Sequence, residues 1–80
     1  LFLRGLNWLE GERCPPQGRH ARVKLRSAHQ PIEATVYGLP QERAHVVFDT
    51  PQYGVAPGQA CVVYDGGRVL GGGWIEHSRS

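Results

Sequence analysis

The sequence predicts an all-β fold, a small closed antiparallel barrel of about six strands. Short runs of β-branched and aromatic residues alternate along the chain with turn residues such as Gly and Pro. No segment shows sustained helical periodicity or a capping box before an apolar run. A sheet that closes on itself also leaves no strand edge exposed to other chains. The order of the strands in the barrel is left open.

The clearest strand pattern lies in residues 55–75, which read VAPGQACVVYDGGRVLGGGWI. Two apolar runs, residues 60–64 and 69–70, are joined by Asp65, Gly66, Gly67 and Arg68. A Gly-Gly pair between such runs is typical of a tight antiparallel turn, so we expect a β-hairpin. Just before it, Pro57 fixes φ and Gly58 permits a positive φ, which suits a type II turn.

Three consecutive glycines, Gly71, Gly72 and Gly73, follow this hairpin and precede Trp74. Glycine loses the most backbone entropy on ordering, so such a run needs a structural reason inside a strand. Glycines in strands usually mark a bulge, a barrel corner or the close approach of another backbone. We expect a sharply coiled strand that closes the barrel. The run lacks the Lys-Ser/Thr of a phosphate-binding loop, so its role should be conformational.

The other expected elements follow from alternation and turn residues. In chain order they are an edge strand or leading segment in residues 1–8, a loop at 10–18, a strand at 19–26, a strand at 32–37 and its hairpin partner at 43–49. Pro15 and Pro16 cannot donate to a sheet, which supports the loop. Gly38, Leu39 and Pro40 are expected to end the strand at 32–37.

The strand at residues 19–26 has the most regular alternation. Ala21, Val23 and Leu25 fall on one face, which we expect to be buried. The opposite face forms what we call the basic ribbon: Arg22, Lys24 and Arg26, with His20 and the flanking Arg19. Successive ribbon cations would lie about 6–7 Å apart, close to the phosphate spacing along a nucleic-acid backbone. These residues alone favour a solvated strand face over an RNA contact, because exposed cations also protect sheets from aggregation.

Composition sets further bounds. The chain has 80 residues, a formal charge of +2, 20% charged and 40% hydrophobic residues. These values fit one globular domain and argue against disorder, but so small a charge does not by itself indicate a nucleic-acid partner. No apolar run approaches the roughly 20 residues of a membrane span, and the start has no signal-peptide pattern. A chain that begins with Leu1 and contains no Met is expected to come from a longer one.

Several motifs resemble the C-terminal end of the bacterial tRNA-specific 2-thiouridylase (MnmA) family. They are residues 55–60 (VAPGQA), 63–66 (VYDG) and 69–75 (VLGGGWI), together with residues 47–52 (VFDTPQ), which resemble a family strand ending in Phe-Asp and a Pro-containing turn. Residues 6–8 and 23–26 lie at the same relative positions as the corresponding segments of the family. The resemblance spans nearly the whole chain, with residues 39–44 the least characteristic. Leu25 stands where the family often has a Tyr.

The resemblance implies a six-stranded barrel similar to the second domain of translation elongation factors, with residues 1–80 as one C-terminal domain of a larger enzyme. It implies that this enzyme uses ATP and Mg²⁺ to adenylate the wobble uridine of certain tRNAs. Sulfur from a protein persulfide, delivered by a sulfur-relay protein, would then replace the C2 oxygen. The ATP-binding loop and the catalytic cysteines would precede Leu1, so we expect no catalytic residue and no cofactor in this chain.

The implied partners are tRNA and the upstream catalytic domain, without membrane or DNA, in the cytoplasm. With the resemblance, RNA contact through the basic ribbon becomes the favoured interpretation. The alternative is a purely structural module that packs on the catalytic domains without touching RNA. An independent enzyme is disfavoured, because the sequence shows no catalytic constellation.

The remaining reactive residue types are given low weight. Cys14 and Cys61 are too few for a disulfide scaffold or a zinc site, so both are expected to be reduced thiols, with Cys61 in the core. The alternative for Cys14 is a persulfide carrier. No histidines are paired at metal-ligand spacing, so no metal site is expected. Trp8, Tyr53 and Trp74 are expected to pack in the core or at a domain interface rather than stack on bases.

Overall fold

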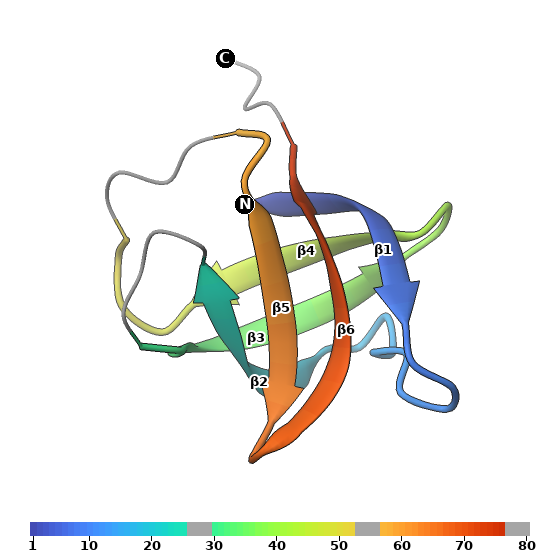
Figure 1. Ribbon diagram of the computed structural model, residues 1–80, viewed down its shortest axis with the longest axis horizontal. Coiled ribbons are helices and arrows are strands. Elements are labelled where there is room, and N and C mark those ends of the chain that lie inside the picture. Colours follow the sequence, from blue (N-terminus) through green and yellow to red (C-terminus); the bar gives the residue numbers. More distant parts are fainter. Residues whose placement is uncertain (26–29, 53–56, 77–80) are drawn as a thin grey trace.

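The computed structural model describes residues 1–25, 30–52 and 57–76, which form six β-strands (Figure 1). The strands are β1 (Phe2–Trp8), β2 (Arg19–Leu25), β3 (Ile32–Leu39), β4 (Arg43–Phe48), β5 (Ala60–Asp65) and β6 (Arg68–Ile75). The predicted all-β class with about six strands is confirmed. Among the described residues, no helix is long and apolar enough to cross a membrane.

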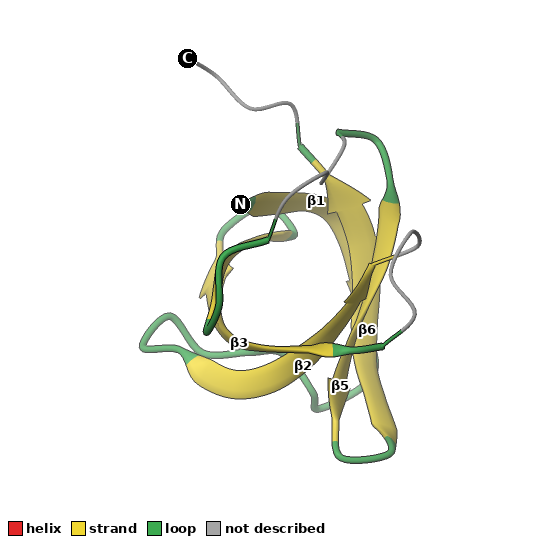
Figure 2. Cartoon of the chain, turned by 90° about the vertical axis from the view of Figure 1, so that its left-hand side faces the viewer, coloured by secondary structure: helices red, strands yellow, loops and turns green. Residues whose placement is uncertain are grey.

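The six strands close into a barrel in the order β1-β4-β3-β2-β5-β6, and every neighbouring pair is antiparallel. Figure 2 shows the strands as a ring. β1 lies between β4 and β6, with Phe2 opposite His45 and Trp8 opposite Gly71. Both interpretations of residues 1–8, an edge strand and a leading segment, are therefore wrong, because this strand is paired on both sides and completes the barrel.

The core fills the inside of the ring with small and medium-sized apolar side chains from all six strands. The buried hydrophobic residues are Leu3, Leu6, Cys14, Ala21, Val23, Leu25, Ala34, Val36, Ala44, Val46, Cys61, Val63, Leu70 and Ile75. No polar or charged residue is buried in the described part of the chain. The predicted inward face of β2 is confirmed, since Ala21, Val23 and Leu25 are all buried.

The glycine run lies inside β6, where the backbone of β1 comes very close. A Cβ atom on Gly71 would lie 2.8 Å from the carbonyl oxygen of Asn7, and one on Gly73 would lie 2.9 Å from that of Arg4. Both separations are too short for real Cβ contacts, so only glycine permits this strand pairing. Of the three reasons considered for the glycine run, the structure shows the close approach of another backbone. The β1–β6 register also shifts between Arg4 and Asn7.

The two predicted turns flank β5. Gly58 has φ of +85°, which fits the third position of a type II turn after Pro57. Gly66 and Gly67 link β5 to β6, and Gly66 has φ of +62° while Gly67 has no positive φ. A positive φ at the first central residue alone is typical of a type II′ hairpin turn.

The strand at residues 32–37 is longer than predicted, because Gly38 and Leu39 continue it to pair with Ala44 and Arg43. Gly38 does not stop the strand but accommodates the loop before β2. A Cβ atom there would lie 2.0 Å from the carbonyl oxygen of Cys14, and the Gly38 N–H donates to the carbonyl of Pro15 at 3.0 Å. The loop is thus fastened to β3 through this glycine.

Both thiols lie in the core. Cys14 is 1% exposed and Cys61 is 2% exposed, which confirms the predicted place of Cys61. Burial raises the pKa of Cys61 to about 11. It also raises the pKa of Cys14 above the ordinary 9.0, although the nearby Arg19 charge opposes this shift. A buried, protonated thiol is a poor nucleophile, so the fold does not favour Cys14 as a persulfide carrier.

The contact at Gly38 gives a stability prediction. Gly38→Ala places a methyl group against the Cys14 carbonyl and should lower the free energy of unfolding by about 2–3 kcal/mol. Gly67→Ala is the matched control, because a Cβ there meets nothing within 4 Å. Urea denaturation of both variants measures the difference. Equal stability of the two variants would contradict the close approach at Gly38.

The buried thiols give a reactivity prediction. At pH 8 both thiols are protonated and covered in the folded chain, so a thiol-specific disulfide reagent should react with them only through opening of the barrel. In denaturant, both should react at the rate of an unstructured cysteine. Rapid modification of Cys14 in the folded chain, located by mass spectrometry of the labelled peptide, would revive it as a sulfur carrier.

Candidate nucleic-acid interface

The basic ribbon lies on the outer face of β2. Strand alternation turns His20 and Arg22 outward while their neighbours fill the core, and their side chains are 59% and 53% exposed. Lys24 follows on the same face and is half-buried. Arg19, at the start of β2, is 28% exposed. The fifth ribbon residue, Arg26, lies outside the described residues.

The described ribbon is not a bare cationic stripe, because carboxylates on neighbouring strands face it. Arg22 Nε lies 2.7 Å from Glu33 Oε2, and Arg19 lies 2.6 Å from Asp65 Oδ2. Arg19 also approaches Glu12 at 3.7 Å. Sheet pairing explains the first contact, since Arg22 and Glu33 are opposite each other in the β2–β3 register. These side chains form a cation–carboxylate network rather than a cluster of one sign.

The arginine–carboxylate contacts keep both partners ionised. The hydrogen bond from Arg19 holds the pKa of Asp65 below its ordinary 3.8, and the same bond raises the pKa of Arg19. The contact is still open to solvent, since Asp65 is 53% exposed. Exposed ion pairs of this kind contribute only about 0–1 kcal/mol each, so another anion can replace the carboxylate at small cost.

The sequence missed the acidic half of this network. Glu33, Asp49 and Asp65 lie far apart in the chain and carry no shared motif. Glu33 on β3 and Asp65 on β5 lie beside β2 because these strands are its two neighbours. Asp49 follows β4, the next strand beyond β3, and its side chain reaches His20 at 3.3 Å. Between Arg22, Glu33, Tyr64 and Asp65 the surface forms a small depression of about 210 Å³. Predicting these neighbouring carboxylates would have required the strand order, which local sequence patterns do not encode.

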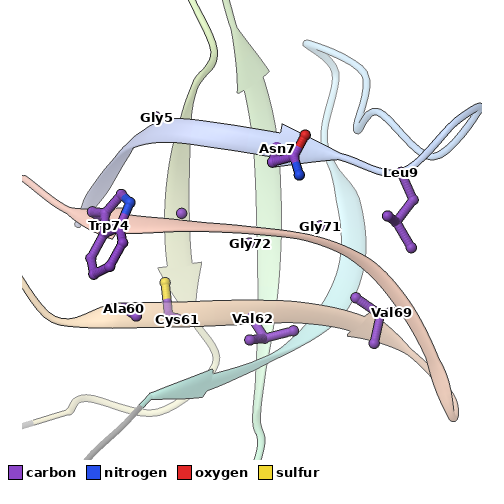
Figure 3. A pocket seen from close by; sticks show the side chains of 11 residues that line it. Gly5, Asn7, Leu9, Ala60, Cys61, Val62, Val69, Gly71, Gly72 and Trp74 are labelled. Carbon is purple, nitrogen blue, oxygen red and sulfur yellow. The ribbon is translucent and has the colours of Figure 1, made fainter.

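A second surface feature is an apolar groove of about 400 Å³ on the outer face of β1, β6 and β5 (Figure 3). Its floor is the glycine run, and no charged residue lines it. Figure 3 shows Trp74 at one end and Leu9 with Val69 at the other. These three side chains are 45%, 47% and 37% exposed. Trp74 is thus available to a partner surface.

The other two aromatic predictions have different outcomes. Trp8 packs against the buried core cluster, as expected for an aromatic residue in a small barrel. Its ring contacts the Gly71 position across the β1–β6 pairing. Tyr53 lies outside the described residues.

The groove and the ribbon are neighbours on the outer surface. Lys24 on β2 pairs with Val62 on β5, and Val62 pairs with Gly72 on β6. Gly72 in turn lies opposite Asn7 on β1. One lateral row of the barrel therefore runs from the ribbon to the floor of the groove, so charged and apolar surfaces meet along β5.

The arrangement provides ionic and apolar contacts but no reactive group. Among the described residues both cysteines are buried, and β2 carries His20, Arg22 and Lys24 at strand spacing on its outer face. Such a face can bind an extended anion through several weak contacts. Base-independent contact with a phosphate backbone is the chemistry that fits it.

Comparisons with known proteins agree with this architecture. The family described as the aminomethyltransferase beta-barrel domain matches residues 1–75. The chain is 50% identical over 76 residues to the tRNA-specific 2-thiouridylase MnmA of Magnetococcus marinus, and 44% identical over 75 residues to that of Ehrlichia ruminantium (strain Gardel). Each match covers 94% of this chain.

The MnmA of Rhodospirillum rubrum is 49% identical over 85 residues, a match that covers 99% of this chain. The chain spans about a fifth of the length of these relatives. The resemblance to the C-terminal domain of the 2-thiouridylases, seen first in the Gly-rich motifs, is confirmed by these matches. With its closed six-stranded sheet and a match over residues 1–75, the chain belongs to the aminomethyltransferase beta-barrel domain family.

Proposed function

We propose that this chain is the C-terminal barrel of a tRNA-specific 2-thiouridylase and that it helps to hold tRNA through the basic ribbon. The names of the relatives support the choice of tRNA as partner. The observation that carries the proposal is that Arg22 and Lys24 alternate on the outer face of β2, with Arg22 53% exposed.

Phosphate binding would proceed by exchange of anions. Arg22 and Arg19 are held in extended positions by Glu33 and Asp65, at 2.7 and 2.6 Å. A phosphate that arrives at the ribbon can replace either carboxylate, because the exposed pairs are weak. The carboxylates thus order the arginines before binding and also limit the affinity of the free barrel.

The proposed role is binding rather than chemistry. The larger enzyme would adenylate the wobble uridine with ATP and Mg²⁺ and then insert persulfide sulfur supplied by a sulfur-relay protein. These steps are assigned to an upstream catalytic domain of the same polypeptide, with this barrel as one separate domain. The buried thiols of the barrel are in keeping with that division. A cytoplasmic location follows from tRNA as substrate.

The ribbon makes a quantitative prediction for tRNA binding by this chain. Its isolated Kd should be about 10⁻⁴ to 10⁻⁶ M, and log K should fall linearly with log salt. Replacing Arg22 and Lys24 with Ala removes two phosphate contacts, so the slope should become shallower by about 1.4–1.8. Fluorescence anisotropy of labelled tRNA across a salt series measures both quantities.

Two controls sharpen this experiment. The Arg4→Ala/Arg13→Ala variant removes the same charge from outside the ribbon, and it should retain the wild-type slope. Asp65→Asn removes the carboxylate that competes for Arg19, so it should tighten binding. If the ribbon variant and the Arg4/Arg13 control lost affinity equally, bulk charge rather than the ribbon would be responsible.

The apolar groove favours a second candidate function, docking of the barrel on other parts of the longer enzyme. Its lining is uncharged, and Trp74 and Leu9 are nearly half exposed. Relatives about five times longer than this chain would supply a surface to cover it. This role is compatible with RNA contact, since the groove and the ribbon lie on different strands.

Docking predicts a stability effect that appears only in the larger protein. A chimera would carry residues 1–75 in place of the matching segment of the Magnetococcus marinus relative. Trp74→Ser should lower the Tm of this chimera, whereas it should change the stability of the 80-residue chain by about 1 kcal/mol or less. Val47→Ser, at an exposed apolar position outside the groove, is the control. An unchanged chimera Tm with Trp74→Ser would exclude the groove as the docking surface.

A further inference from the structure

Three side chains from different parts of the sheet converge: the ribbon residue His20 on β2, Glu33 on β3 and Asp49 just after β4. One ligand atom from each lies within 4.8 Å of the others. His20 Nε2 is 3.3 Å from Glu33 Oε1 and 3.3 Å from Asp49 Oδ2. The sequence predicted no metal site, because the histidines show no local pairing; strand pairing assembles this group instead.

The backbone holds the three residues in place. Glu33 lies opposite Arg22 in the β2–β3 ladder, one diagonal step from His20. On its other side, the Asp49 N–H donates to the Glu33 carbonyl at 2.9 Å, which extends the β3–β4 ladder by one residue. All three side chains therefore start from hydrogen-bonded sheet positions on one outer face.

The distances fit a shared metal ion as well as a hydrogen bond or ion pair from the imidazole to a carboxylate. A good N–H···O hydrogen bond spans about 2.7–3.2 Å, and one ring nitrogen carries at most one hydrogen for two carboxylates. Both observed separations are 3.3 Å. Around a tetrahedral zinc ion with bonds of about 2.0–2.2 Å, neighbouring ligand atoms lie about 3.3–3.6 Å apart. The two separations from His20 Nε2 match this ligand-to-ligand distance, and the two carboxylate oxygens lie within 4.8 Å of each other.

The charges and the surroundings agree with this assignment. With the imidazole neutral, the two carboxylates give the ligand set a charge of −2, and Arg22 beside Glu33 reduces the local charge to −1, which still attracts a divalent cation. Arg22 Nε binds Glu33 Oε2 at 2.7 Å, so it orients this carboxylate and leaves Oε1 directed at His20. Outer partners of this kind commonly fix the ligands of metal sites. An imidazole in the set favours zinc-type ions over Mg²⁺ or Ca²⁺.

We propose that His20, Glu33 and Asp49 bind one divalent transition metal ion, for which Zn²⁺ is the probe, with a fourth coordination position open to solvent. The site is surface-exposed, as the side chains are 59%, 45% and 51% exposed, so the ion exchanges freely. Binding does not depend on the proposed tRNA contact. The ion would, however, replace two negative charges beside the ribbon with a neutral site.

Calorimetric titration of ZnCl₂ into the metal-free 80-residue chain, in a buffer that does not chelate, tests this assignment. One ion per chain should bind, and His20→Ala and Asp49→Asn should each weaken binding at least tenfold. His45→Ala is the matched control, because this ring stacks on Phe2, away from the triad, and it should leave the affinity unchanged. Circular dichroism of each variant confirms the fold.

A second readout locates the ion. In ¹H–¹⁵N NMR spectra, Zn²⁺ should shift the amides of β2 around His20 and those of Glu33 and Asp49, and these shifts should vanish in the His20→Ala/Asp49→Asn variant. Zinc affinity that the double variant retains would overturn the site, as would the absence of binding by the wild-type chain. Displacement of Zn²⁺ by equimolar Mg²⁺ would overturn the choice of ion class.

Discussion

The close approach of β1 to the glycines of β6 is the constraint on which the rest of the molecule depends. The carbonyl oxygens of Asn7 and Arg4 lie 2.8 and 2.9 Å from where a Cβ on Gly71 and on Gly73 would stand, too close for any side chain. This contact lets the first strand fit between β4 and β6 and closes the ring. Without closure, β1 and its neighbours would expose unpaired edges, and the small core would lose one wall.

Closure of the barrel also determines which surface side chains are neighbours on its outside. β2 is flanked by β3 and β5, so its cations meet Glu33 on one side and Asp65 on the other. β5 then separates the charged surface from the uncharged groove above the glycine run. The glycines that permit closure also leave the bottom of the groove without side chains. Trp74 lies exposed at one end of this groove. One strand arrangement thus provides two surfaces, a charged one for the proposed tRNA contact and an apolar one for the proposed docking on the longer enzyme.

The predictable part of this structure is the part set by local chemistry. Alternation placed Val23 in the core and Arg22 outside, and Gly58 and Gly66 marked turns that need positive φ. The strand order and the ion pairs were not predictable, because Arg19 and Asp65 are 46 residues apart and meet only through the β2–β5 pairing. The backbone of Gln41, with φ of +63° at a residue other than glycine, had no sequence signal. Gly38 was predicted to end a strand, but it continues β3. The sequence alone does not distinguish a glycine that ends a strand from one that makes room for a neighbouring backbone.

The central claim is that tRNA lies along the outer face of β2. An NMR titration of the ¹⁵N-labelled chain with tRNA tests it most directly, because each strand reports separately. If tRNA lies there, the largest amide shifts should fall on Arg19–Leu25 and on the facing residues Glu33 and Asp65, and they should fade as salt is raised. Shifts confined to the groove strands β1 and β6, or shifts that salt leaves unchanged, would contradict it.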